Sequence, residues 1–286
     1  MILVTGATGT VGREVLRLLP ADLRVRVMAR VPARVGHAPA GAETVHGDYA
    51  DPRSLAAALA GVRSVFLVTA DLRRDDGGFL RLARSAGVRH VVKLSAAAVE
   101  DPGADDAVTR WQRGNEELLR ASGMEWTLLR PRSFMSNALS WAGSVRSGQV
   151  VRALYGDSAN SCVDPRDLAE VAAGALTGRI PACAAHTLTG PQALTAVEQT
   201  ARLAELLGRP LRFEELGPDR ARAALARRHP DAVVRALLHS AERQRAGAKS
   251  RVDDTLPRLL GRPARSFRTW AADHLDAFAP PRAPRG

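Results

Sequence analysis

The sequence has few cysteines, few aromatic residues and no long apolar run. Cys162 and Cys183 are its two cysteines, and neither stands in a CxxC or Cys/His pattern, which excludes a disulfide framework. No stretch approaches the ~20 apolar residues of a membrane-spanning helix, and the apolar run after Met1 lacks the basic leader of a signal peptide. We therefore expect a reduced, cytoplasmic protein with no membrane anchor.

Lysine is also scarce. The formal net charge of +11 at pH 7 is carried almost wholly by arginine, because Lys93 and Lys249 are the only lysines. The arginines are scattered, and aromatic residues make up 4% of the chain, too little for a base-stacking platform. The seven histidines show no metal-ligand spacing. We expect no nucleic-acid partner and no metal, but a basic surface that attracts small anions.

Apolar runs alternate with helical patterns over about the first 130 residues. The runs lie at 1–5, 23–29, 43–46, 62–69, 88–95 and 124–130. Strict alternation of strand and helix predicts a parallel sheet with right-handed crossovers, and the mostly apolar runs 62–69 and 88–94 predict strands covered on both faces. The expected fold class is α/β, with a Rossmann-type doubly wound parallel sheet.

The pattern changes after Pro131. A helix rich in Trp and Met, a short strand near 149–155 and another helix from Asp164 are followed by a strand at 186–189. Helices are then expected at 195–207, 218–228, 231–245 and 265–278. We predict a Rossmann domain at 1–131, a smaller, mostly helical substrate-binding part at 132–279 with segments returning to the Rossmann core, and a frayed tail at 280–286.

A glycine-rich turn, GATGTVG, directly follows the first strand and leads into the first helix. Glycines there permit a tight turn, a close approach of the backbone to a pyrophosphate, and close packing of helix on strand. The strand, turn and helix context is the one that dinucleotide binding requires. The predicted cofactor-binding residues of the turn are Gly6, Thr8, Gly9, Thr10, Val11 and Gly12.

The residue at the end of the second strand selects the cofactor. A carboxylate there would bind the ribose 2′-hydroxyl of NAD, whereas an arginine would pair with the 2′-phosphate of NADP. The sequence has Arg30 at this position, with Arg34 nearby, and no acid between Asp22 and Glu43. These residues favour NADP(H).

Several segments together resemble the NmrA-like, atypical short-chain dehydrogenase/reductase family, most closely its NADPH-dependent quinone oxidoreductase and triphenylmethane reductase subgroup. Besides the glycine turn and Arg30, they are HGDY at 46–49, VVKLS at 91–95, EELLRASGMEWTLLRP at 116–131, FMSN at 134–137 and DPRDLAEVAAGAL at 164–176. The ending from Leu260 to Phe278 also resembles the subgroup, so the resemblance covers nearly the whole chain.

The resemblance implies roles for residues along the sheet edge. Thr8, Thr10, Val11 and Arg30 would hold the phosphates, and the loop after Pro131 would cover the nicotinamide and substrate. Asp48 and Tyr49 would lie by the adenine, with Thr69 and Ser95 by the nicotinamide half. These positions agree with ligand binding at the carboxyl ends of parallel strands. For Asp48 and Ser95, a simple turn-capping role stays open.

The chain departs from the wider dehydrogenase superfamily at its acid-base pair. The superfamily's Tyr-x-x-x-Lys falls on Val108 and Gln112 here, and no tyrosine occurs between Tyr49 and Tyr155. Hydride addition to a quinone gives a stabilised phenolate that water can protonate, so the general acid becomes dispensable. The weak catalytic candidates that remain are Ser95, Lys93 and Asn137; Lys93 is equally consistent with a solvated strand end.

Aromatic and apolar side chains cluster after Pro131, where they would suit a flat ring, although helix packing explains them too. The predicted substrate-binding residues are Phe134, Met135, Asn137 and Trp141. The first hypothesis is an NADPH-dependent oxidoreductase that transfers hydride to a quinone or related planar conjugated molecule. The alternative is an NADP(H)-binding redox sensor without turnover, and a non-redox isomerase or dehydratase is the third. A homodimer is left open.

Overall fold

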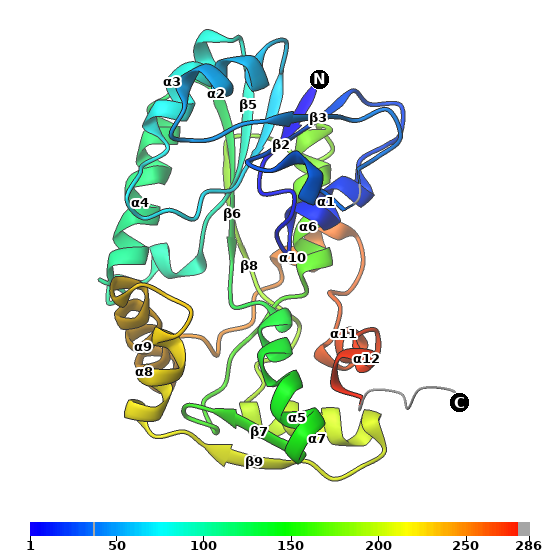
Figure 1. Ribbon diagram of the computed structural model, residues 1–286, viewed down its shortest axis with the longest axis vertical. Helices are drawn as coiled ribbons and strands as arrows, with labels where there is room; N and C mark the ends of the chain where they lie inside the picture. Colours follow the sequence, from blue (N-terminus) through cyan, green and yellow to red (C-terminus); the bar gives the residue numbers. More distant parts are fainter. Residues whose placement is uncertain (37, 280–286) are drawn as a thin grey trace.

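The computed structural model describes residues 1–36 and 38–279, so the predicted tail at 280–286 lies outside the described residues. A seven-stranded parallel sheet forms its centre, in the order β3-β2-β1-β4-β5-β6-β8 (Figure 1). Six strands coincide with the predicted runs within a few residues. The strands are β1 (Ile2–Val4), β2 (Val25–Ala29), β3 (Glu43–His46), β4 (Ser64–Leu67), β5 (His90–Leu94), β6 (Glu125–Pro131) and β8 (Ala184–Leu188).

Helices cover both faces of this sheet. Alternate residues of β1 point to opposite faces of the sheet. On one face, Ile2 and Val4 pack with the apolar residues of α1 (Gly12–Leu18) and α6 (Pro165–Leu176). Leu3 packs on the other face, against α2 (Pro52–Leu59), α3 (Gly77–Ser85) and α4 (Ala107–Arg120). Two apolar cores therefore sandwich the sheet, and the predicted doubly wound α/β fold is confirmed.

A second group of elements lies beyond the carboxyl ends of the strands (Figure 1). It contains η3 (Met135–Trp141), α5 (Ala142–Gly148), β7 (Val150–Ala153), α7 (Ala196–Leu207), β9 (Arg212–Glu215), α8 (Pro218–Ala226) and α9 (Asp231–Arg245). Strands β7 and β9 pair in parallel as a separate ribbon. The polar sequence of β9 gave no strand signal, because its pairing with β7 is a tertiary contact.

The prediction of one continuous helix at 265–278 is wrong, because this segment forms two short helices. The structure has α10 (Thr255–Leu260), α11 (Phe267–Ala272) and α12 (Leu275–Phe278). Ser266 caps α11 by accepting from the Thr269 N–H at 3.1 Å, and the backbone leaves the helical region at His274, with φ −119 and ψ 15. Apolar periodicity continues through this break, so it could not be seen in the pattern.

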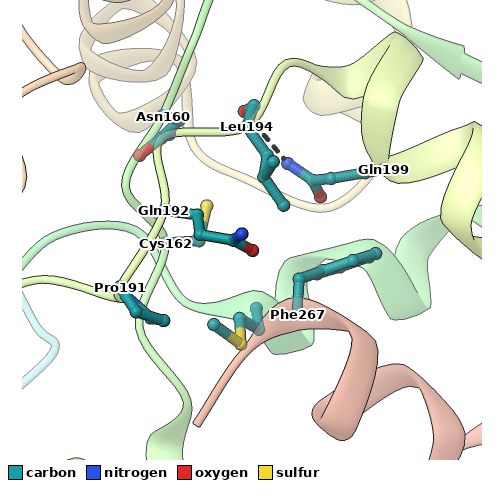
Figure 2. Close-up of a pocket in the computed structure, with 8 residues that line it drawn as sticks. Asn160, Cys162, Pro191, Gln192, Leu194, Gln199 and Phe267 are labelled. Carbon is teal, nitrogen blue, oxygen red and sulfur yellow. Dashed lines mark hydrogen bonds between the residues drawn. The ribbon is translucent and has the colours of Figure 1, made fainter. Parts of the chain in front are cut away.

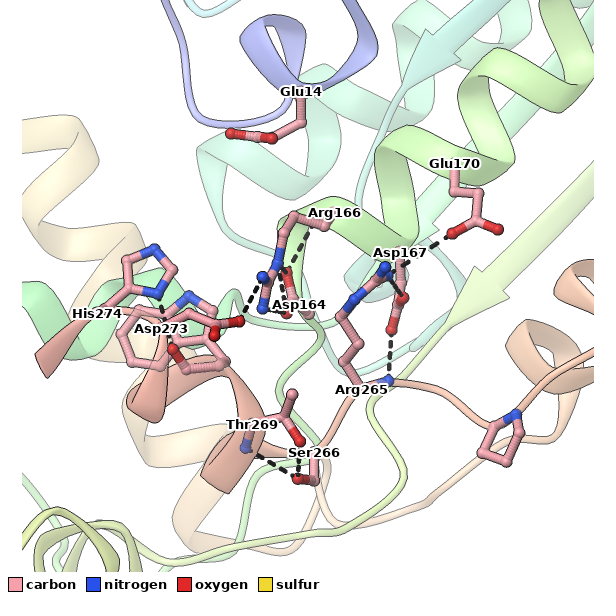
Figure 3. A network of polar contacts seen from close by, with 12 residues as sticks. Glu14, Asp164, Arg166, Asp167, Glu170, Arg265, Ser266, Thr269, Asp273 and His274 are labelled. Atoms are coloured by element: carbon pink, nitrogen blue, oxygen red, sulfur yellow. Dashed lines mark hydrogen bonds and ion pairs between the residues drawn. The ribbon is translucent and has the colours of Figure 1, made fainter. Parts of the chain in front are cut away.

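Ion pairs attach the C-terminal segment to α6 (Figure 3). Asp167, fully buried, accepts hydrogen bonds from the Arg265 backbone N–H at 2.7 Å and from Arg262 Nη2 at 2.8 Å. Arg166 bridges Asp164 and Asp273, each at 2.6 Å. Because Asp164 and Asp167 are fully buried and would be left unpaired without these arginines, the cluster fixes residues 262–273 against the sheet domain.

Candidate cofactor and substrate site

The glycine turn at 6–12 is closed so tightly that Gly6 and Gly12 have no room for a side chain. Gly6 has φ +61, and a Cβ on Gly12 would lie 2.3 Å from the Gly6 carbonyl oxygen. The Gly9 N–H donates to the same oxygen at 2.9 Å. Within the described chain, the N–H groups of Thr8, Thr10 and Val11 have no backbone acceptor. The turn thus presents free donors at the carboxyl end of β1, as a pyrophosphate site requires.

Arg30 stands where β2 ends and is exposed. The His46 Nδ1 atom lies 3.1 Å from its backbone carbonyl oxygen. Its guanidinium makes no hydrogen bond or ion pair with any residue that the structure describes. A planar, always charged side chain without an internal partner is free to bind a phosphate bidentately.

Asp48 and Tyr49 follow β3, next to Arg30. Asp48 accepts from the Ala50 N–H at 2.8 Å, which makes a local turn. The Tyr49 hydroxyl donates to the Val68 carbonyl at 3.1 Å, and its ring lies 5.6 Å from that of Phe79. Burial raises the pKa of Tyr49 above its usual value. Tyr49 can therefore offer a cofactor its ring but not a reactive hydroxyl.

Lys93 lies inside the protein rather than at a solvated strand end, so that interpretation is corrected. Its ammonium is 2.6 Å from Asp76 Oδ2, and both side chains are 0% exposed. It also donates to Thr69 Oγ1 at 3.3 Å and lies 5.7 Å from the centre of the Trp111 ring. The Asp76 oxygens accept no well-directed hydrogen bond from described residues, so charge at close range holds the pair. Through its hydrogen bond, the buried Lys93 holds the Thr69 hydroxyl in place.

Ser95 is also engaged internally. Its hydroxyl donates to Glu116 Oε1 at 2.6 Å, and Glu116 in turn binds Arg130 at 2.5 Å and Arg120 at 3.1 Å. Burial acts to raise the pKa of Glu116, but the hydrogen bonds and charges of Arg130, Ser95 and Arg120 outweigh it and lower the pKa below 4.5. The sequence placed Glu116 in a stretch that resembles the family but gave it no role, because its partners Ser95 and Arg130 lie along the sheet; Arg120 is one turn away on α4 itself.

Replacing Glu116 with glutamine is expected to lower the free energy of unfolding at neutral pH by about 2–3 kcal/mol, because a charge-assisted network is lost. A carboxylate whose pKa is lower in the folded state contributes stability above its unfolded pKa and loses it as pH falls through the folded value. The difference between wild type and variant should therefore shrink below pH 4.5. Urea unfolding at neutral and acidic pH measures it; parallel stability curves would contradict this role.

The residues after Pro131 divide between core and surface. Met135 is buried, Phe134 and Trp141 are half-buried, and Asn137 is exposed. Met135 and Trp141 pack in the third apolar cluster, with α5, α7 and α11. Of the four predicted substrate residues, only Asn137 is exposed, and the substrate-binding role of the set stays a prediction.

A small pocket lies behind this segment, between α7, α11 and the loop after β8 (Figure 2). Its wall includes Met135, Asn160, Cys162 and Phe267. Burial raises the pKa of the Cys162 thiol to about 12, so the thiol is protonated and unreactive.

The described residues include no group of three metal-ligating side chains. No helix in the described part of the chain has the length and apolarity to cross a bilayer.

The strand order, with a glycine turn at the carboxyl end of β1 where the order reverses, defines a Rossmann dinucleotide-binding protein. The chain belongs to the NAD(P)H-binding family, whose model matches residues 6–178. It is an NAD(P)H-binding oxidoreductase of the atypical short-chain dehydrogenase/reductase type, and the resemblance seen in the sequence is confirmed.

Two relatives and one solved structure are similar to this protein over nearly the whole length of its chain. The (4-alkanoyl-5-oxo-2,5-dihydrofuran-3-yl)methyl phosphate reductase of Streptomyces griseus is 56% identical over 281 residues, 98% of this chain and 100% of that protein. The NAD(P)H azoreductase of Xenophilus azovorans is 36% identical over 97% of this chain and 99% of its own. An NADPH-dependent quinone oxidoreductase from Escherichia coli, solved with NADPH, has a TM-score of 0.82 at 25% identity, over 96% and 100% of the two chains.

Proposed function

We propose that this protein transfers hydride from NADPH to a planar, conjugated small molecule, a quinone or an activated unsaturated carbonyl compound. The observation that carries the proposal is the tightly closed glycine turn together with Arg30, one strand away, which pairs with no residue that the structure describes. The turn suits a pyrophosphate and Arg30 suits a 2′-phosphate, so the two together favour NADPH over NADH.

The site supports a reaction that needs little acid catalysis. Tyr49, Lys93 and Ser95 are bound to Val68, Asp76 and Glu116, so none is free to protonate a substrate. The substrate named for the Streptomyces griseus relative has a ring double bond conjugated to two carbonyl groups. Hydride added at its 3-position leaves negative charge shared by both carbonyls, as addition to a quinone leaves a phenolate, and water can then protonate the product.

A substrate panel tests this proposal. Purified protein with NADPH should oxidise the cofactor in the presence of a 4-alkanoyl-dihydrofuranone, a benzoquinone or an azo dye, followed through the absorbance of the reduced nicotinamide. The relatives named as reductases favour turnover over sensing. Tight NADPH binding without oxidation by any of the three compounds would favour the redox sensor instead.

Replacing Arg30 with alanine is expected to weaken NADPH binding about 10–100-fold and NADH binding little, since one charged contact to the 2′-phosphate is lost. Fluorescence titration of the reduced nicotinamide measures both constants. Arg24→Ala is the matched control, because it removes an exposed arginine at the opposite, amino end of β2 and should change neither constant. Equal losses for NADPH and NADH in Arg30→Ala would contradict the cofactor assignment.

The proposal includes a cytoplasmic location and a small-molecule partner, with no nucleic acid. The proposed chemistry is compatible with a monomer and with a homodimer. Sedimentation of the purified protein would distinguish the two.

A further inference from the structure

Arg132 lies at the carboxyl end of β6 with donors to spare. Its N–H donates to the Leu188 carbonyl at 2.9 Å, and its Nη1 reaches the Ala248 carbonyl at 3.2 Å. Its Nε is buried without a hydrogen-bond partner, and no described carboxylate forms an ion pair with it. Arg130, two residues earlier, pairs with Glu100 and Glu116. Arg132 therefore keeps a charge that the fold does not neutralise.

Lys249 lies beside Arg132, in the loop after α9. Its carbonyl accepts from the Ser161 N–H at 3.0 Å and the Ser161 hydroxyl at 3.2 Å, which fixes this loop across segment 160–162. Lys249 as a residue is half-buried, and its ammonium makes no hydrogen bond or ion pair with the residues that the structure describes. Burial, reinforced by Arg132, lowers the pKa of Lys249 to about 8. Two adjacent cations are thus partly removed from water.

Three carboxylates act on the pair from a distance, Glu100 and Asp101 on Arg132 and Asp106 on Lys249, but none of them forms an ion pair with it among the described residues. Glu100 pairs with Arg130, and Asp101 pairs with Arg243. Asp106 caps α4, accepting from the Val108 N–H at 2.9 Å and the Thr109 N–H at 3.0 Å. Cys162 keeps its proton, because burial raises the pKa of the thiol to about 12. An anion that entered here would meet two unpartnered cations.

The position of the pair separates it from the coenzyme phosphates. The glycine turn and Arg30 stand at the ends of β1 and β2, whereas Arg132 stands at the end of β6. The strand order reverses between β1 and β4, so a dinucleotide lying across this point has its adenine half over β2 and β3 and its nicotinamide half towards β6. A site for an anion beside β6 therefore faces the substrate.

We propose that Arg132 and Lys249 bind a phosphate monoester carried by the substrate. This inference rests on the proposed function, and the phosphate in the name of the 56% identical relative supports it. In that compound one CH₂ group joins the phosphate to the ring carbon at the 3-position. Arginine and lysine together match the charge of a phosphate dianion, and holding it would also fix the ring that receives hydride.

The test uses the full chain saturated with NADP⁺ and a ligand that cannot be reduced. Calorimetry would compare a saturated 3-(phosphonooxymethyl) lactone with the corresponding alcohol. Wild-type protein should bind the phosphate ester at least about tenfold more tightly than the alcohol. Arg132→Met and Lys249→Met should each abolish this preference and leave the affinities for the alcohol and NADP⁺ unchanged. An unchanged preference in both variants would overturn the proposal.

Matched variants separate binding from folding and from general charge. Lys249→Arg should keep most of the phosphate preference. Arg251→Met removes an 82% exposed charge, 3.7 Å from Asp253, in the same loop. This charge acts on Arg132 only from a distance, so the variant should lower the phosphate preference much less than Lys249→Met. Lys249 makes no side-chain hydrogen bond to a described residue, so Lys249→Met should fold as wild type and decide the matter even if Arg132→Met does not fold. A loss in Arg251→Met equal to that in Lys249→Met would reduce the effect to surface charge and refute a defined subsite.

The two proposals fail separately. If the phosphate preference depends on Arg132 and Lys249 but no conjugated compound is reduced, the subsite stands and the proposed reaction is wrong. If reduction proceeds equally with the phosphate ester and the alcohol, the reaction stands and the subsite is wrong.

Discussion

Replacing Lys93 with methionine is expected to lower the free energy of unfolding by about 3–5 kcal/mol, because it leaves the Asp76 carboxylate buried without a cation. Lys93 and Asp76 are 2.6 Å apart and both are 0% exposed. Methionine has a similar length and no charge, so the change isolates the ion pair from packing. Urea or guanidinium unfolding of the purified chain measures the loss.

Two controls test the physical cause. The double variant Lys93→Met/Asp76→Leu should recover most of the stability, since a buried pair replaced by apolar side chains is often neutral. Arg268→Met breaks a pair of the same 2.6 Å length with Glu205, but with side chains 57% and 62% exposed. That variant should lose less than about 1 kcal/mol. Similar losses for Lys93→Met and Arg268→Met would show that burial is not the cause.

Replacing Gly12 with valine is expected to weaken NADPH binding at least about 100-fold, or about 2.7 kcal/mol. A Cβ at this position would lie 2.3 Å from the oxygen and 2.7 Å from the carbon of the Gly6 carbonyl. Both atoms belong to the backbone, so the turn must open and its free N–H groups lose their common direction. Titration of the reduced nicotinamide fluorescence measures the affinity.

Gly114 provides the control for this change. It lies within α4, and a Cβ there meets nothing within 4 Å. Gly114→Ala should leave NADPH binding unchanged and stabilise the helix by about 0.5–1 kcal/mol. Wild-type NADPH affinity in Gly12→Val would mean that the turn does not hold the pyrophosphate.

Local sequence signals were enough for the sheet domain. Six strands, the glycine turn and the position of Arg30 follow from apolar runs and from turn chemistry that neighbouring residues determine. Strand β9 was missed because its pairing with β7 joins segments about 60 residues apart. The break at His274 was missed because the apolar residues on both sides keep a helical spacing.

The interior of the site was less predictable, since it depends on contacts between distant residues. The partners of Lys93 and Ser95 are Asp76, which directly precedes α3, and Glu116 on α4, and the sequence gave neither residue a role. The sequence contained one indication that Lys249 is unusual. In a chain whose basic residues are almost all arginine, it is one of two lysines, and lysine is the side chain whose pKa burial can bring near neutrality.

Transfer of deuterium tests the central claim most directly. NADPH deuterated at C4 of the nicotinamide, in both stereochemical forms, would be incubated with the protein and a 4-alkanoyl-dihydrofuranone phosphate. The account predicts that one of the two forms delivers deuterium to the ring carbon at the 3-position, detected by NMR of the product. A product without deuterium from either form, or no reduction although NADPH binds, would contradict it.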